Sequence, residues 1–463
     1  MTLSYSAPLV RTAVPGPRSK ELLDRQQVRE SSARTYPRYL PIAIRRAAGS
    51  YVEDLDGNVF LDFLAGAGVL SLGHNHPRVV AAVREQLGDL VHGLDFPTPA
   101  KDAFTEAQLG MLPGDMGDRF KIHYCGPTGA NAVEAALKLA KIATGRTDIV
   151  AFSGGFHGST AGAMAVTGNV GPKAAVGNGL PGVHFFPFSY CRRCPLGLRP
   201  ETCSTNCATY LRSVLTDANG GVPRPAGVLL ELIQGEGGSV VATREFVREV
   251  RQLTRELEIP LIVDEVQTGC GRTGSWFAFE QYDIEPDIVI ASKALSGIGL
   301  PVSVLLYRGD LDRWSPGAHI GTFRGNQLAF ASGVAALDYV RSADVLGNVC
   351  RRGAQIAQSL GALAARVPGI AEVRGRGLLW GVEFGDTDGL SGSQVAAAVR
   401  AECLRRGLIV ELGGRDDCVL RLLPPLTVSE AEIAVALDIV HDAVAAAFPQ
   451  PSHRDNRVPA QVR

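Results

Sequence analysis

Residues 259–269 read IPLIVDEVQTG, an apolar run that stops abruptly at two neighbouring acids, Asp264 and Glu265. Short apolar runs of the same kind occur at residues 120–125 (FKIHYC), 148–153 (DIVAFS), 226–233 (AGVLLELI), 286–292 (PDIVIAS) and 301–307 (PVSVLLY). Continuous apolar runs of this length are typical of strands buried on both faces, as in a mostly parallel sheet covered by helices. Segments with helical periodicity, 129–143 and 243–257, lie between them. The sequence therefore predicts an α/β fold.

The chain on either side of this α/β region predicts a second, smaller α+β unit. From Tyr51, YVEDLDGNVFLDF reads as two short strands joined by a turn at Asp56-Gly57. After about residue 335 come a helical region, VRGRGLLWGVEF (373–384), a helix at 392–406, CVLRLL (418–423) and a last helix from Ser429. We expect five segments: an N-terminal arm (1–30), the N-terminal part of a small domain (31–74), a large domain (75–335) with a Cys-rich insertion (190–208), the C-terminal small domain (336–448) and a flexible tail (449–463).

Composition argues against several classes of protein. The 463 residues include 46 Lys and Arg against 47 Asp and Glu, a net charge of −1, which gives no reason to expect nucleic acid or an anionic membrane as a partner. No apolar run is long enough to span a bilayer, and the first 20 residues contain no apolar block before a small-residue cleavage site. We expect a cytoplasmic enzyme.

Four of the nine cysteines cluster as CRRCPLGLRPETCSTNC, at Cys191, Cys194, Cys203 and Cys207. Tetrahedral zinc can take four thiolates from a short loop of this spacing. The alternative is a surface insertion, containing Pro and Gly, whose thiols are free. No second motif supports zinc, so we predict no metal site and keep the zinc knuckle as the alternative.

Ligands of open α/β sheets bind beyond the carboxyl ends of the strands, so the polar residues that close each strand are informative. Thr128-Gly129-Ala130 opens a helix after the first run, where free N–H groups attract phosphate. Phe156 and His157 stand between glycines after the second run, which suggests a ring held against something flat. Each feature also has a plain structural explanation: a tight turn for the first, a core aromatic for the second.

Two charged residues complete the set. Asp264 ends a buried strand, where a carboxylate needs a cationic partner, although a structural salt bridge would serve as well. Lys293 follows PDIVIAS, and an amine desolvated at a strand end has a lowered pKa and can attack an aldehyde; the alternative is a lysine that reaches the surface. One molecule combines the four groups that these residues would bind. Pyridoxal 5'-phosphate (PLP) has a phosphate, a flat ring, a cationic ring nitrogen and an aldehyde.

Over residues 35 to 445 the chain resembles the class III, ornithine-type aminotransferases of fold type I. The motifs that carry the resemblance are TGANAVEAALKLAK (128–141), ELIQGEGG (231–238), DEVQTGCGRTG (264–274), ASKALSGIGLP (291–301), PGAHIGTFRGNQLA (316–329) and LRLLPPLTVSE (420–430). The sequence of residues 316–329 is most similar to that of the family branch that acts on diaminobutyrate and 2-oxoglutarate.

The resemblance implies a role for each motif residue. Thr128, Gly129 and Ala130 would hold the phosphate, joined by the partner subunit's Thr322 across a homodimer interface. The other residues implied at the cofactor are Phe156 and His157, Val266 on the ring face opposite Phe156, Asp264 at the ring nitrogen, Gln267 at the phenolic oxygen and Lys293 at the aldehyde. Glu236 and Arg421 would form a pair that opens for an α-carboxylate and stays closed for a diamine, and Arg324 would contact substrate.

Two positions depart from the family pattern. Leu232 stands where many relatives have Pro, a neutral change at a strand end. Ser159 stands where ornithine-type enzymes often have Arg, so a clamp for the substrate carboxylate is missing unless Arg324 or Arg38 replaces it. Ornithine itself is therefore a poorer expectation than L-2,4-diaminobutyrate or a similar diamine or ω-amino acid, with 2-oxoglutarate as acceptor.

Two other functions remain open from the sequence. The same cofactor shell serves amino-acid racemases, decarboxylases and enzymes of side-chain replacement, so the motifs alone do not exclude those reactions. A non-catalytic PLP-fold protein is the second alternative, but binding alone needs none of the electronic tuning that Lys293, Asp264 and Gln267 supply. No basic segment or helix-turn-helix pattern supports a regulator.

Overall fold

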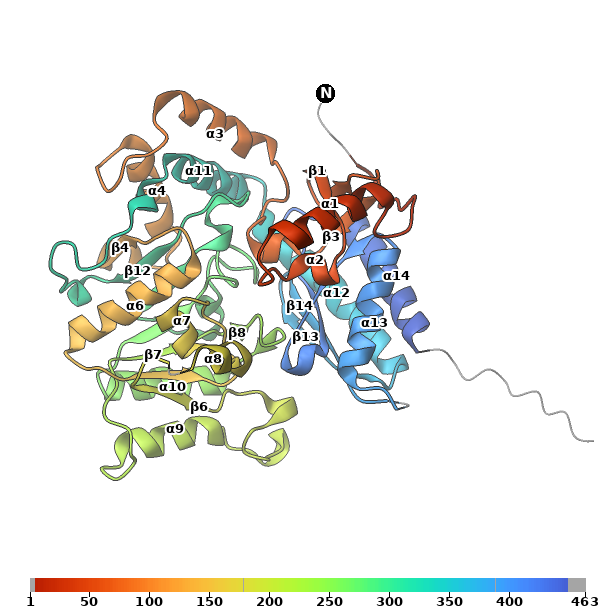
Figure 1. The fold of residues 1–463 in the computed structure, drawn as a ribbon. Coiled ribbons are helices and arrows are strands. Elements are labelled where there is room, and N and C mark those ends of the chain that lie inside the picture. Colours follow the sequence, from red (N-terminus) through yellow and green to blue (C-terminus); the bar gives the residue numbers. More distant parts are fainter. Residues whose placement is uncertain (1–4, 178, 388, 449–463) are drawn as a thin grey trace, which may run out of the picture.

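The computed structural model describes residues 5–177, 179–387 and 389–448, so the predicted tail 449–463 lies outside the described residues. Figure 1 shows two bodies side by side, one formed by the middle of the chain and the other by N-terminal and C-terminal elements together. Among the described residues, no helix combines the length and apolar character needed to cross a membrane.

A seven-stranded sheet forms the centre of the first body. Its strands, in spatial order, are β4 (Phe120–Tyr124), β12 (Val304–Arg308), β11 (Ile288–Ala291), β10 (Leu261–Asp264), β7 (Gly227–Leu230), β5 (Ile149–Phe152) and β6 (Val183–Phe186). Six of these seven strands run in one direction, and β12 runs in the opposite direction. The six apolar runs of the sequence are confirmed as strands, and the α/β prediction is correct; β6, a half-exposed strand at the edge, was not predicted.

Both faces of this sheet are buried, because alternate residues of each strand face opposite helix layers. Ile262 of β10 packs in one apolar cluster with Ala136 and Ala140 of α6 (Gly129–Thr144). Its neighbours Leu261 and Val263 belong to the cluster on the other face, with Phe246 of α10 (Arg244–Glu256). The remaining helices of this body are α3 (Pro77–Asp89), α4 (Pro99–Leu109), α5 (Met116–Arg119), α7 (Ala161–Val166), α8 (Val170–Val176), α9 (Asn206–Thr216) and α11 (Gln327–Ser342).

The second body contains two four-stranded sheets. The first has the order β1 (Ile44–Ala48), β2 (Tyr51–Asp54), β3 (Val59–Asp62), β15 (Leu408–Ile409); the second has β13 (Ile370–Arg376), β14 (Leu379–Phe384), β17 (Val419–Leu422), β16 (Glu411–Gly413). Its long helices are α12 (Val345–Arg366), α13 (Gly392–Arg405) and α14 (Glu430–Ala447). The predicted hairpin is confirmed as β2 and β3, with Gly57 at φ 81 in the turn, a value that favours glycine.

The N-terminal segment is attached to this second body more firmly than its polar sequence suggests. Residues 17–29 form helix α1 (Pro17–Arg29), and Asp56 in the β2–β3 turn accepts hydrogen bonds from the backbone N–H groups of Arg18 and Ser19, both at 2.8 Å. A carboxylate at this position satisfies N–H groups that a helix start leaves free. Helix α2 (Tyr36–Tyr39) follows, directly before β1.

The apolar clusters support the segment boundaries that the sequence predicts, and we propose them as domains. One large cluster joins residues 51–79 to residues 336–444, whereas the two clusters around the seven-stranded sheet lie between residues 104 and 337. Residues 31–74 and 336–448 would therefore form one small domain around a shared core, and residues 75–335 the large one.

Candidate active site

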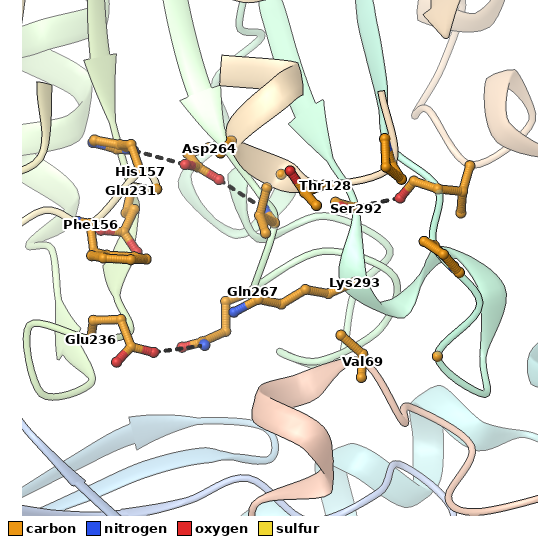
Figure 2. Close-up of a pocket in the computed structure, with 18 of the residues that line it drawn as sticks. Val69, Thr128, Phe156, His157, Glu231, Glu236, Asp264, Gln267, Ser292 and Lys293 are labelled. Carbon is orange, nitrogen blue, oxygen red and sulfur yellow. Dashed lines mark hydrogen bonds and ion pairs between the residues drawn. The ribbon is translucent and has the colours of Figure 1, made fainter. Parts of the chain in front are cut away.

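A cavity of about 350 Å³ opens at the carboxyl ends of β4, β5, β10 and β11 (Figure 2). Most of the residues predicted at the site line it, and they are Thr128, Gly129, Ala130, Phe156, His157, Glu236, Asp264, Val266, Gln267 and Lys293. They come from loops that are distant in sequence but follow neighbouring strands, which is where ligands of open α/β sheets bind.

Lys293 begins a 3₁₀ turn (Lys293–Ser296) directly after β11 and points into the cavity toward Gln267 (Figure 2). Its backbone φ is +37°, an uncommon value for a residue with a side chain. Desolvation by the surrounding protein lowers the pKa of the amine, and the charge of Arg421 lowers it further, while Glu236 and Asp264 oppose the shift. A lysine with a lowered pKa is a nucleophile toward a carbonyl carbon.

Asp264, the last residue of β10, is fixed by two contacts. Its Oδ1 accepts the backbone N–H of Val266 at 3.0 Å, and its Oδ2 lies 2.8 Å from Nδ1 of His157. Burial by itself would lower the pKa of His157, but the hydrogen bond and charge of Asp264 outweigh burial, and the pKa is raised. The pair thus holds a carboxylate in place at the bottom of the cavity.

Glu231 is a third buried acid beside this pair, and sequence reasoning missed it. Its carboxylate accepts the backbone N–H groups of Phe156, at 2.9 Å, and of Gly235, at 3.2 Å. Burial, opposed by the charge of His157, raises its pKa to about 7. The signal was present, because Glu231 follows the apolar run of β7 as Asp264 closes that of β10.

The start of α6 offers room and donors for an anion. A Cβ added to Gly129 would lie 3.0 Å from a methyl group of Val266, and one added to Gly158 would lie 2.6 Å from Cβ of Ala130, so the loop accepts only small residues. The first N–H groups of a 16-residue helix lack partners within the helix and attract phosphate.

The remaining walls suit a flat ring. Phe156, whose side chain is 37% exposed, presents its ring to the cavity, and Val266 lines it as well (Figure 2). Among the described residues, the buried Oε1 of Gln267 has no hydrogen-bond partner, so it is free to meet a polar group of a bound ligand. A small aromatic aldehyde with a phosphate, such as PLP, fits these residues.

An arginine shared by two acids lies at the far end of the site. Arg421 of β17 donates to both carboxylate oxygens of Glu236, at 2.9 and 2.8 Å, and to Glu411 of β16 at 2.8 Å. Gln267 Nε2 reaches Glu236 at 3.5 Å. The predicted partners Glu236 and Arg421 are therefore in contact. Glu411 and the nearby Tyr36 were not predicted, because neither belongs to a motif.

Two predicted residues lie elsewhere. Thr322 is in the 3₁₀ turn Thr322–Gly325, where its carbonyl oxygen is 2.7 Å from Nε2 of His92. Arg324 pairs with Asp95 and donates to the carbonyl oxygen of His319 at 3.2 Å. Neither residue lines the cavity of its own chain. Arg38, the other substitute for the missing clamp, is bonded to backbone oxygens of Arg34 and Ser32.

The clustered cysteines are all free, in a segment of two 3₁₀ turns (Cys191–Arg193 and Pro200–Thr202) and the start of α9. Within the described part of the chain, no three His, Cys, Asp or Glu side chains are arranged to hold a metal ion. The zinc knuckle therefore stays an alternative raised by the sequence. The segment is anchored by Arg193 and Tyr190, which both hydrogen-bond Glu383 of β14, the former at 2.7 Å.

Comparisons with known proteins agree with this geometry. Residues 31–444 match the family model described as aminotransferase class-III. The chain is 50% identical over 436 residues to a diaminobutyrate–2-oxoglutarate aminotransferase of Rhizobium meliloti (strain 1021), covering 92% of each protein. It is 46% identical over 424 residues to the protein of the same name from Haemophilus influenzae, covering 89% of this chain and 92% of the relative. Among solved structures, an amine transaminase from an uncultivated Pseudomonas species in its PLP-bound form is similar with a TM-score of 0.81 at 27% identity, covering 91% of this chain and 98% of the other.

Proposed function

The chain belongs to the class III aminotransferases of fold type I and uses PLP, and from that premise we propose its substrates and the role of each residue in its site. We propose that it moves the terminal amino group between L-2,4-diaminobutyrate, or a similar diamine or ω-amino acid, and 2-oxoglutarate. With diaminobutyrate the products are aspartate 4-semialdehyde and glutamate. The 50% identity to a relative with that name supports the substrate pair.

The observation that carries the chemistry is a desolvated amine, Lys293, in the same cavity as a fixed carboxylate, Asp264. We propose that Lys293 binds the aldehyde carbon of the cofactor and, once free, takes the proton from the substrate carbon that bears the amino group. Bound PLP supplies an electron-withdrawing ring that stabilises the negative charge left on that carbon. Asp264, oriented by His157, would keep the ring nitrogen protonated.

The other cavity residues would hold the cofactor in place. Thr128, Gly129 and Ala130 lie at the start of α6, where a phosphate is favoured. Phe156 and Val266 would provide apolar surfaces for the two ring faces, and Gln267, whose Oε1 has no partner among the described residues, would hydrogen-bond the phenolic group through its amide. These assignments rest on the position of each side chain in one cavity.

We propose a homodimer in which the partner subunit's Thr322 completes the phosphate site. Its support is that Thr322 belongs to a matching motif yet does not line the cavity of its own chain. Light scattering tests the assembly: we expect twice the 49.0 kDa mass of one chain. Arg324, which also lies outside that cavity, would reach substrate in the same way.

We propose that Glu236 controls access to Arg421. With Glu236 in place, the guanidinium is covered and a diamine can bind; when Glu236 moves, an α-carboxylate of glutamate or 2-oxoglutarate can pair with Arg421. Ser159 at the position of the usual arginine agrees with a donor other than ornithine.

Single half-reactions test the amino transfer. We expect L-2,4-diaminobutyrate, supplied without an oxo acid, to convert the bound cofactor to its amine form. The change in the absorbance of the cofactor measures this conversion. Mass spectrometry should then identify aspartate 4-semialdehyde. If no diamine or ω-amino acid produced this change, while an amino acid was racemised or decarboxylated instead, the alternative PLP reaction would be correct.

The cytoplasmic location stays a prediction from the sequence, which cell fractionation would test.

A further inference from the structure

Arg421 is hydrogen-bonded to two carboxylates, those of Glu236 and Glu411. Glu236 binds Arg421 through two hydrogen bonds, and Glu411, the cross-strand partner of Arg421 in the β16–β17 pair, accepts a hydrogen bond from Nη2 at 2.8 Å. Within this group of three side chains, two carboxylates face one guanidinium. Burial and the charge of Glu236 raise the pKa of Glu411, although the charges of Arg421, Lys293 and Arg400 oppose the shift.

Exposure decides which charge a ligand meets. The side chain of Arg421 is 1% exposed, whereas that of Glu411 is 20% and that of Glu236 is 34% exposed. Glu236 lines the cavity, whereas Arg421 and Glu411 lie behind it, so a molecule that enters the cavity meets the carboxylate of Glu236 before the guanidinium. Glu411, joined to Glu236 through Arg421, adds a second carboxylate directly behind it. Burial, with the charges of Glu411 and Glu236, raises the pKa of Tyr36 to about 12, so its hydroxyl stays neutral and does not offset the two carboxylates.

Such an environment favours a ligand whose far end carries a positive charge. A 2,4-diamino acid that presents its 4-amino group to Lys293 carries an α-ammonium beside the carboxylate at its other end, whereas an ω-amino acid without an α-amino group carries the carboxylate alone. Ammonium groups hydrogen-bonded to carboxylates in a partly desolvated site gain more than neutral pairs do.

We propose that Glu411 is a specificity-determining residue that, with Glu236, receives the α-ammonium of a diamino-acid donor. The inference rests on the proposed function and extends it. Glu411 has its own hydrogen bond to Arg421, so this bond should keep the arginine in place when Glu236 moves. The same charge should weaken binding of dicarboxylates, so Glu411 favours the donor over the acceptor.

Two donors of equal length isolate this interaction. L-2,4-diaminobutyrate and 4-aminobutyrate share the reacting 4-amino group and the carboxylate, and differ only in the α-ammonium. In the wild-type holoenzyme we expect the diamine to have the higher kcat/KM. In Glu411→Gln we expect the ratio of the two kcat/KM values to fall by roughly 10-fold to 100-fold, through a higher KM for the diamine, with kcat nearly unchanged.

Two further variants keep the test decisive. Asp416→Asn removes an exposed carboxylate from the 3₁₀ turn (Arg415–Asp417) that follows β16, and the ratio should not change. Glu411→Asp retains the charge and should keep most of the preference, even if Glu411→Gln binds the cofactor poorly. The proposal is overturned if Glu411→Gln leaves the ratio unchanged, if it lowers kcat/KM equally for both donors, or if Glu411→Asp and Glu411→Gln lose the preference alike. A wild-type enzyme inactive with any diamine would overturn the proposed function as well, which is a separate outcome.

Discussion

His157 Nδ1 lies 2.8 Å from Asp264 Oδ2, and the two side chains are only 1% and 5% exposed. A buried carboxylate that meets a histidine from one side and a backbone N–H from the other has little freedom to turn. Asp264 is therefore oriented before any ligand binds, which is what electrostatic stabilisation of a charged ring nitrogen requires.

We expect Asp264→Asn to lower kcat by on the order of 100-fold or more, because an amide cannot keep a ring nitrogen protonated. Bound cofactor should still be visible, since Lys293 is unchanged. Steady-state kinetics and the absorbance spectrum measure the two effects. The neighbouring Glu265→Gln is the control, because Glu265 contacts Phe279 and Thr268 and does not line the cavity. Equal loss in both variants would contradict the assignment.

Lys293→Ala should abolish the visible absorbance of the lysine-bound cofactor and lower turnover by at least about 10³-fold, since in the proposed mechanism the amine both binds the cofactor and moves the proton. Lys121→Ala, which removes an exposed lysine paired with Asp312, should change neither property. An unchanged spectrum in Lys293→Ala would show that another residue holds the cofactor.

Glu265 should make stability depend on pH. Burial raises the pKa of this carboxyl to about 7, so the folded protein binds a proton that the unfolded chain has already lost. Stability should therefore fall as the pH rises from about 4.5 toward 7. Glu265→Gln imitates the protonated acid, so its thermal midpoint should match the wild type near pH 5 and exceed it near pH 8, by roughly 2–6 °C. A constant difference at both pH values would contradict this account.

The buried Glu383 should hold the Cys-rich segment against the second body. Its side chain is 1% exposed and binds Arg374 at 2.6 Å and Arg193 at 2.7 Å, so its removal leaves Arg193 without its carboxylate and Arg374 with Glu372 alone. We expect Glu383→Ala to cost about 3–5 kcal/mol and to speed amide hydrogen exchange in residues 190–203. Glu372→Ala, which removes a more exposed partner of Arg374, should have a much smaller effect.

Local patterns in the sequence predicted the parts of the structure that depend on neighbouring residues. The apolar runs predicted the strands, and two residues that follow them, Asp264 and Lys293, line one cavity at the edge of the sheet. Contacts that depend on strand pairing were beyond such reasoning. Glu411 meets Arg421 only because β16 and β17 pair in one particular register. Asp56 binds the start of α1 from a turn 38 residues away along the chain, which no local pattern of α1 reveals.

The left-handed backbone of Lys293 has a consequence for the evolution and engineering of this enzyme. A side-chain-bearing residue at φ +37°, with an amine surrounded by protein, is unfavourable for folding in both its backbone and its charge. Selection for heat resistance alone would replace it, and glycine at this position would relax the backbone. Lys293 is thus a point of trade-off between thermostability and activity, and stabilising mutations should be sought elsewhere in the chain.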